Sequence, residues 1–100
     1  MVLERYGFIL KAAGYEPAMH NAQIDCAGFA SRIVCVSDVD QAVAAAQHMI
    51  EAGVQLIELC GGFSVDEAAQ LIAAVNGAVP VGHVAFSPRE LQRLQDFLAG

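Results

Sequence analysis

The stretch LIELCGGF, residues 56–63, is followed at once by SVDE, residues 64–67. Its apolar part is typical of a buried strand, its glycine pair of a tight turn, and SVDE of the capping box that opens a helix. A strand that leads into a helix is the repeating unit of α/β proteins. The stretch therefore decides the fold class. It also places Glu58, Cys60 and free backbone N–H groups at a sheet edge where such proteins bind small molecules.

The same unit recurs along the chain. Apolar runs predict four strands, over residues 6–11, 29–36, 54–60 and 79–86. Helical spacing of apolar residues predicts a helix after each of the last three strands, over 38–52, over 64–76 and from 87 onward. The pattern is weakest around residues 16–22, where Pro17 favours a short helix.

Each predicted helix opens at a serine that ends a strand. These serines are Ser37, Ser64 and Ser87, and an acidic residue follows each of them three positions later, as at helix starts. Alternating strands and helices predict right-handed crossovers and a parallel sheet, so that the helix N-termini share one edge. We therefore expect a single α/β domain over residues 1–100. It has about four mostly parallel strands in βα units, in an open sheet or partial barrel with flanking helices.

The chain is unusually apolar for its length. Hydrophobic residues make up 56% of its 100 residues, against a usual ~45–50%, and charged residues make up 16%. One small domain cannot easily hide that much apolar surface. We therefore expect self-association, as a homodimer or a higher oligomer.

The charge balance narrows the range of partners. A net charge of −6 with five basic residues leaves no basic stripe for nucleic acid and no attraction to an anionic membrane. We find no signal-peptide pattern and no apolar stretch of the ~18–20 residues that a membrane span needs. The three cysteines fit reduced thiols better than disulfides, so we expect a cytoplasmic protein.

Glu58 is the sharpest departure from the apolar strand pattern. Strands of a parallel sheet are expected to be covered by helices on both faces, so this carboxylate would be buried, a setting that suits a general acid or base. The alternative is a structural partnership with Lys11 or an arginine. His83 lies on the next predicted strand, where it could approach Glu58 as an acid–base pair or bond to a backbone carbonyl.

The residues that follow this strand could hold a ligand. Cys60 precedes a helix N-terminus, a setting that favours a reactive thiol, although most free cysteines are small buried hydrophobes. Gly61, Gly62 and Ser64 offer backbone N–H groups to a phosphate or carboxylate, or serve only as turn and cap. Lys11 ends the first predicted strand and is either a counter-ion at this edge or a surface charge.

Two kinds of site are not expected. The glycine fingerprints of nucleotide-binding loops are missing from the sequence. No pair of Cys or His residues has the spacing of a metal site, so we expect no metal and no cofactor.

Two resemblances to known families add to this interpretation. Residues 52–59 resemble an early βα unit of the aldolases that cleave 2-keto-3-deoxy-6-phosphogluconate, which implies that Glu58 handles protons. The Schiff-base lysine of that family has no counterpart here. Over its whole length the chain resembles small bacterial proteins known only as a domain of unknown function, through residues 7–11, 53–63 and 80–82. That resemblance implies a fold and a site region but no activity.

The sequence leaves three functions open, and with them whether the protein is an enzyme. The first is binding of a small polar or anionic metabolite at the carboxyl edge of the strands. Its candidate groups are Lys11, Cys60, Gly61, Gly62 and Ser64. The second is a small lyase or isomerase that uses Glu58 and His83 for proton transfer. The third is a non-catalytic assembly module.

Overall fold

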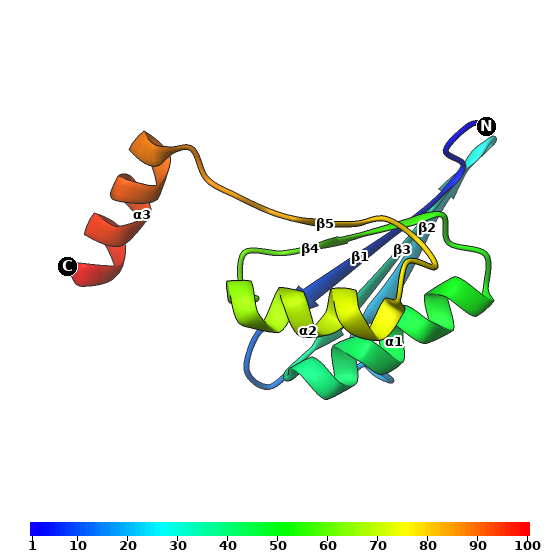
Figure 1. The fold of residues 1–100 in the computed structure, drawn as a ribbon, viewed down its shortest axis with the longest axis horizontal. Helices are drawn as coiled ribbons and strands as arrows, with labels where there is room; N and C mark the ends of the chain where they lie inside the picture. Colours follow the sequence, from blue (N-terminus) through cyan, green and yellow to red (C-terminus); the bar gives the residue numbers. More distant parts are fainter.

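Five strands form one open sheet in the order β2-β3-β1-β4-β5, with three helices attached to it (Figure 1). The structure, a computed structural model, describes residues 1–100. The elements in chain order are β1 (Arg5–Lys11), β2 (Asn21–Cys26), β3 (Phe29–Val36), α1 (Val39–Glu51), β4 (Leu56–Leu59), α2 (Val65–Val75), β5 (Val81–His83) and α3 (Pro88–Ala99). The predicted α/β class with a mostly parallel, open sheet is confirmed.

The parallel part of the sheet is built from the predicted strands. β1 pairs in parallel with β3 on one side and with β4 on the other, and β4 pairs in parallel with β5. The carboxyl ends of these four strands therefore lie at one edge, as expected from the alternation of strands and helices. We refer to it below as the carboxyl edge.

The prediction of a short helix over residues 16–22 is wrong. One turn forms there, with the N–H groups of Met19 and His20 donating to the Glu16 carbonyl, and the antiparallel strand β2 follows at once. Gly28, with φ +92°, makes the tight turn between β2 and β3. Polar and apolar residues alternate along β2, and this short edge strand lacks the apolar run by which the others were predicted.

The helix starts differ in their chemistry. Ser64 caps α2 through the predicted capping box, in which it accepts from the Glu67 N–H while the Glu67 carboxylate accepts from the Ser64 N–H. Ser87 caps α3 by accepting from the Glu90 N–H. The prediction that Ser37 opens α1 is wrong, because the N-cap of this helix is Asp38. A carboxylate accepts the first free N–H groups of a helix as well as a hydroxyl does.

The core lies between the sheet and two helices. Figure 1 shows α1 and α2 side by side on the same face of the sheet. Ile9, Ile57 and Leu59 point from the strands into this layer and are fully buried against Met49 of α1 and Leu71 of α2. We call this side the covered face.

The opposite side of the sheet has no helix over it, and we call it the open face. The strand register places on it Tyr6, Phe8, Leu10, Ala22, Ile24, Cys26, Phe29, Ser31, Ile33, Cys35, Leu56, Glu58 and Gly82. The expectation that helices cover both faces is therefore wrong, and with it the burial of Glu58, which is exposed. The open face is uncovered because α3, the only helix besides α1 and α2, lies beyond the carboxyl edge and not over the sheet.

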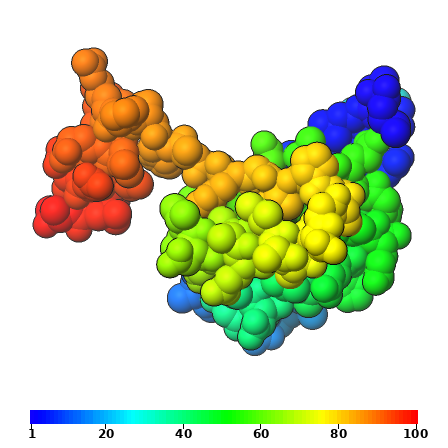
Figure 2. Space-filling view, viewed as in Figure 1, coloured from blue at the N-terminus to red at the C-terminus, as the bar shows by residue number.

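Helix α3 begins at Pro88, as predicted, but does not flank the sheet. The chain leaves β5 in an extended conformation and carries α3 beyond the carboxyl edge, so that the helix stands apart from the rest of the molecule (Figures 1 and 2). None of its side chains is buried. The length and apolar character that a bilayer-crossing helix needs are found in none of the three helices.

Candidate functional site

Glu58 lies on the open face, where its partner is a tyrosine. The Tyr6 hydroxyl donates to Glu58 Oε1 at 2.5 Å, and neither Lys11 nor an arginine pairs with this carboxylate. Burial, together with the hydrogen bond and the negative charge of Glu58, raises the pKa of Tyr6 from 10.0 to about 12. The Tyr6 hydroxyl therefore remains protonated and holds the carboxylate in place.

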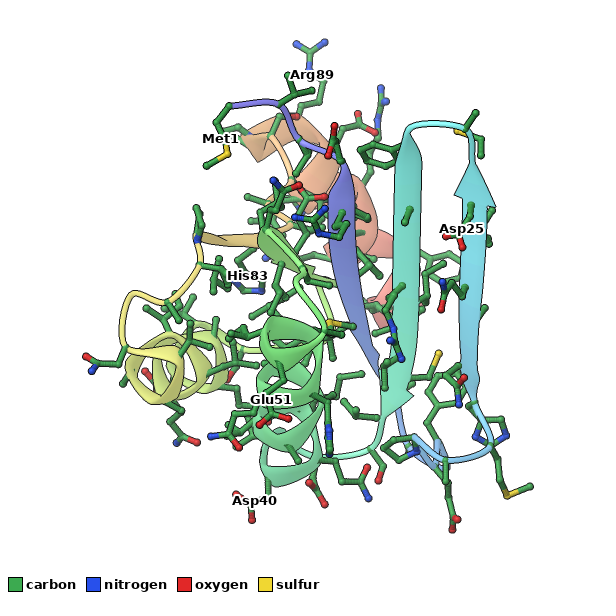
Figure 3. All side chains as sticks on the ribbon, turned by 90° about the vertical axis from the view of Figure 1, so that its right-hand side faces the viewer. Met1, Asp25, Asp40, Glu51, His83 and Arg89 are labelled. Atoms are coloured by element: carbon green, nitrogen blue, oxygen red, sulfur yellow. The ribbon has the colours of Figure 1, made fainter.

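His83 lies on the other side of the sheet from Glu58. Register pairs Glu58 with Gly82, so the next residue, His83, points to the covered face (Figure 3). There its Nε2 lies 2.9 Å from the Phe63 carbonyl oxygen, to which it can donate. The expected acid–base pair of Glu58 and His83 is therefore wrong, because successive residues of a strand point to opposite faces.

Lys11 reaches the carboxyl edge, but its charge is compensated within the chain. Its Nζ lies 3.4 Å from Glu67 Oε2 and 3.5 Å from the Gly62 carbonyl oxygen. The Ser64 N–H and the Lys11 ammonium together hold the pKa of the Glu67 carboxyl below its usual value. The expected pairing of Lys11 with Glu58 is wrong, since Lys11 extends from the covered face of β1.

Cys60 and the glycine turn pack against the end of β1. Cys60 Sγ accepts from the Lys11 N–H at 3.2 Å and from the Gly62 N–H at 3.3 Å. A Cβ on Gly62 would collide with the Lys11 carbonyl oxygen, so this position requires glycine. The structure thus brings Lys11, Cys60, Gly62 and Ser64 together as predicted, but their hydrogen bonds run to one another. A ligand-binding role for them stays a prediction.

The cavity next to these residues is chiefly apolar. It measures about 670 Å³ and opens between the carboxyl edge and α3, where Figure 2 shows the molecule hollowed. Cys60, Gly61 and His83 border it on the side of the edge. The other walls are Phe8, Phe63, Val65, Val84, Ala85, Phe86, Leu91 and Leu94. No carboxylate, lysine or arginine lines the cavity, so it offers apolar contact above all.

A second pocket of about 420 Å³ lies between α1 and the β2–β3 hairpin, and we call it the α1–hairpin pocket. Its polar groups come from Asn21, Arg32, Gln41 and His48. Its apolar walls are Pro17, Ala18, Val34, Ala44, Ala45 and Met49. This pocket therefore combines an apolar surface with a few convergent polar groups, the usual make-up of a small-molecule site.

Arg32 is the one full charge in the α1–hairpin pocket, and it has no partner. It stands on the covered side of β3, in register with Gly7 and Gln23. The ion pairs of the chain are Glu4–Arg5, Lys11–Glu67 and Glu90–Arg93, and the Arg32 side chain makes no hydrogen bond. No acidic residue lines the pocket, although the chain has eleven. A basic, unpaired site in an acidic protein can attract an anion.

The α1–hairpin pocket could not be predicted from the sequence, because the strand β2 that forms part of the hairpin lacks an apolar run. His48 is exposed on α1 and borders the pocket because the hairpin extends beside the helix. One feature of the sequence could have pointed to the pocket, because Arg32 is the only charged residue in the apolar run 29–36. No three His, Cys, Asp or Glu side chains gather closely enough to hold a metal ion.

Comparison with known proteins identifies a family without an assigned activity. The sequence model of a family of unknown function (DUF6506) matches residues 4–99. The searches of curated proteins and of solved structures found no match. The predicted likeness to a family of unknown function is confirmed, whereas nothing in the comparisons supports the likeness to the aldolases.

Proposed function

The chain belongs to the DUF6506 family of unknown function, and from its own geometry we propose that it binds a small anionic metabolite in the α1–hairpin pocket. The ligand class is the one expected from the sequence, but the site differs. The basic group at the carboxyl edge, Lys11, is already paired with Glu67, whereas Arg32 is unpaired. An anion would therefore displace an ion pair at the edge but none in the pocket.

The unpaired guanidinium of Arg32 is the observation that carries this proposal. A guanidinium binds a carboxylate through two parallel hydrogen bonds, which gives both affinity and orientation. A carboxylate also matches the single full charge of the pocket. His48 stands on the same pocket and offers a ring N–H to the polar end of a ligand, whereas the Asn21 side-chain amide already donates to the Pro17 and Ala18 carbonyls.

The walls of the pocket define the remainder of the ligand. Val34, Ala45 and Met49 provide an apolar surface beside Arg32. Contact with this surface stabilises an apolar body by about 25 cal/mol for each Å² removed from water. The volume of about 420 Å³ lies toward the lower end of the range for small-molecule sites. The ligand that fits is a small carboxylic acid with a short apolar chain or one ring.

Binding without a chemical step is the function that this geometry favours. The alternative of a lyase or isomerase depended on Glu58 and His83, and these residues point to opposite faces of the sheet. The Glu58 carboxylate instead accepts from the Tyr6 hydroxyl. We therefore do not propose a proton-transfer reaction.

Calorimetric titration with matched pairs of probes tests the proposal. We expect isovalerate and phenylacetate to bind, and their neutral amides, isovaleramide and phenylacetamide, to bind at least tenfold more weakly. Arg32→Gln should weaken carboxylate binding to the level of the amides, because a hydrogen bond to a charged group contributes about 1.5–3 kcal/mol.

The control for this titration is Arg89→Gln, which removes the same charge from α3 and should leave binding unchanged. Equal binding of the acids and their amides would contradict the role of the charge. Carboxylate binding that survives Arg32→Gln, or no binding by either acid, would remove the α1–hairpin pocket as the site.

A further inference from the structure

Helix α3 has an apolar stripe that its own chain leaves largely uncovered. Leu91, Leu94 and Leu98 recur at helical spacing on one side of the helix. Leu98 is 72% exposed and the neighbouring Phe97 is 80% exposed. A helix of this length is marginal in water on its own, and most helices in proteins are stabilised by packing of their apolar side. Helix α3 therefore needs a surface to cover.

The open face of the sheet is an apolar surface with nothing on it. The half-buried side chains there include Phe8 and Leu10 of β1, Ile33 of β3 and Leu56 of β4. At the edge of the same face, Ile24 of β2 is 63% exposed. Strands that are apolar on both sides are typical of sheets covered on both faces, and this chain covers only one.

The exposed area of the chain is larger than that of a compact monomer of the same mass. A compact monomer of 10.5 kDa exposes about 5,400 Å² by the usual scaling of surface with mass. This chain exposes 6440 Å². The excess of about 1,000 Å² is close to the ~800 Å² that each partner buries in a stable protein–protein interface.

We propose that the open face is covered by α3 of a second copy of this chain, in a symmetric homodimer that exchanges its C-terminal helices. Each chain carries both the helix and the open face. A two-fold axis therefore places the α3 of each chain on the open face of the other, so that both helices and both faces are covered. The dimensions agree: a helix of 12 residues is about 18 Å long, and the seven residues of β1 span about 23 Å.

The course of the chain after β5 keeps α3 away from its own open face. The Val84 N–H donates to the Leu59 carbonyl, so the chain continues along the sheet beyond β5. Residues 84–87 carry the chain past the carboxyl edge before α3 begins, so that the helix stands apart from its own sheet (Figure 1). The cavity of about 670 Å³ between α3 and its own domain is the space left for the second copy.

Sedimentation equilibrium of the full chain at micromolar concentration tests this proposal. We expect a mass of twice 10.5 kDa. Leu94→Glu should raise the dissociation constant of the dimer by roughly a hundredfold, because it buries an unpaired charge in the interface. Gln92→Glu is the matched control, since it adds the same charge on the polar side of α3, and it should leave the dimer intact.

A second pair of variants tests the face. Ile24→Glu places a charge on the open face and should dissociate the dimer. Gln23→Glu places the same charge on the neighbouring residue of β2, whose side chain points to the covered face. It should leave the dissociation constant of the dimer unchanged. None of the four residues is buried in the core, so circular dichroism should show the fold unchanged in each variant.

Each other outcome overturns the proposal. A monomeric unmodified chain means that α3 covers its own sheet or that another molecule covers both surfaces. A dimer broken by Ile24→Glu but not by Leu94→Glu means that two sheets pack directly on each other. A dimer broken by Leu94→Glu but not by Ile24→Glu means that α3 pairs with α3, and a dimer that survives both changes lies on another surface.

Discussion

The two faces of the sheet are made from the same strands but differ in what covers them. On the covered face, Ile9 and Ile57 have no exposed surface. On the open face their neighbours Phe8 and Leu56, just as apolar, are partly exposed. The difference shows that burial of a strand residue is determined by the layer above it. For the open face, that layer does not come from the same molecule in this structure.

The largest expected effect is a truncation on the covered face. Ile57→Ala should lower the free energy of unfolding by about 2–5 kcal/mol, because it removes buried methyl groups and leaves a cavity among Ile9, Met49 and Leu71. Chemical denaturation in urea measures this loss. It should not depend on protein concentration, since the site lies inside one chain.

Leu56→Ala is the matched change on the open face. It should cost less in dilute solution, and the cost should grow with protein concentration as the dimer forms. Equal, concentration-independent losses for Ile57→Ala and Leu56→Ala would show that the two faces do not differ as described.

A smaller effect is expected from adding one methyl group to each face. A Cβ on Gly7 would lie 2.7 Å from Met49 Sδ, so Gly7→Ala forces the buried Met49 side chain to repack between β1 and α1 and should cost about 1–3 kcal/mol. Gly82→Ala places the same group on the open face, 3.6 Å from Glu58 Cγ, which is an ordinary contact. Its effect on thermal unfolding should stay within about 1 kcal/mol. A reversed order would mean that β1 and α1 are less closely packed than the structure shows.

The smallest expected effect is on the titration of Tyr6. Its pKa of about 12 lies above the usual 10.0, so its neutral form contributes stability that is fully present below pH 10 and is lost as the pH rises through 12. Glu58→Gln removes the negative charge and should lower the pKa of Tyr6, although not to 10.0, because burial is the larger cause. NMR titration of the Tyr6 ring measures the shift, and an unchanged pKa would rule out the Tyr6–Glu58 contact.

Most of the covered face could be predicted from the sequence. Apolar runs located four of the five strands, and the spacing of Ser64 and Glu67 located the start of α2, because both signals are local. The open face could not be predicted in this way. The run Phe8–Leu10 is apolar on both sides, which indicates two covering layers but does not say which molecule supplies them.

The candidate sites show the same limit. The residues of the carboxyl edge were correctly placed near one another, since parallel strands end together. Their partners were not predicted, because the choice between Glu58 and Glu67 as the partner of Lys11 depends on which face each side chain occupies. Arg32 was missed because its neighbours come from β2, a strand without an apolar run.

Isotope-filtered NMR on a mixture of labelled and unlabelled chains tests most directly whether a second copy covers the open face. The exchanged dimer predicts contacts between methyl groups of Leu91 and Leu98 in one copy and side chains of Phe8 and Ile33 in the other. Contacts of these groups only within one copy would show that α3 folds back on its own sheet, and would contradict the account.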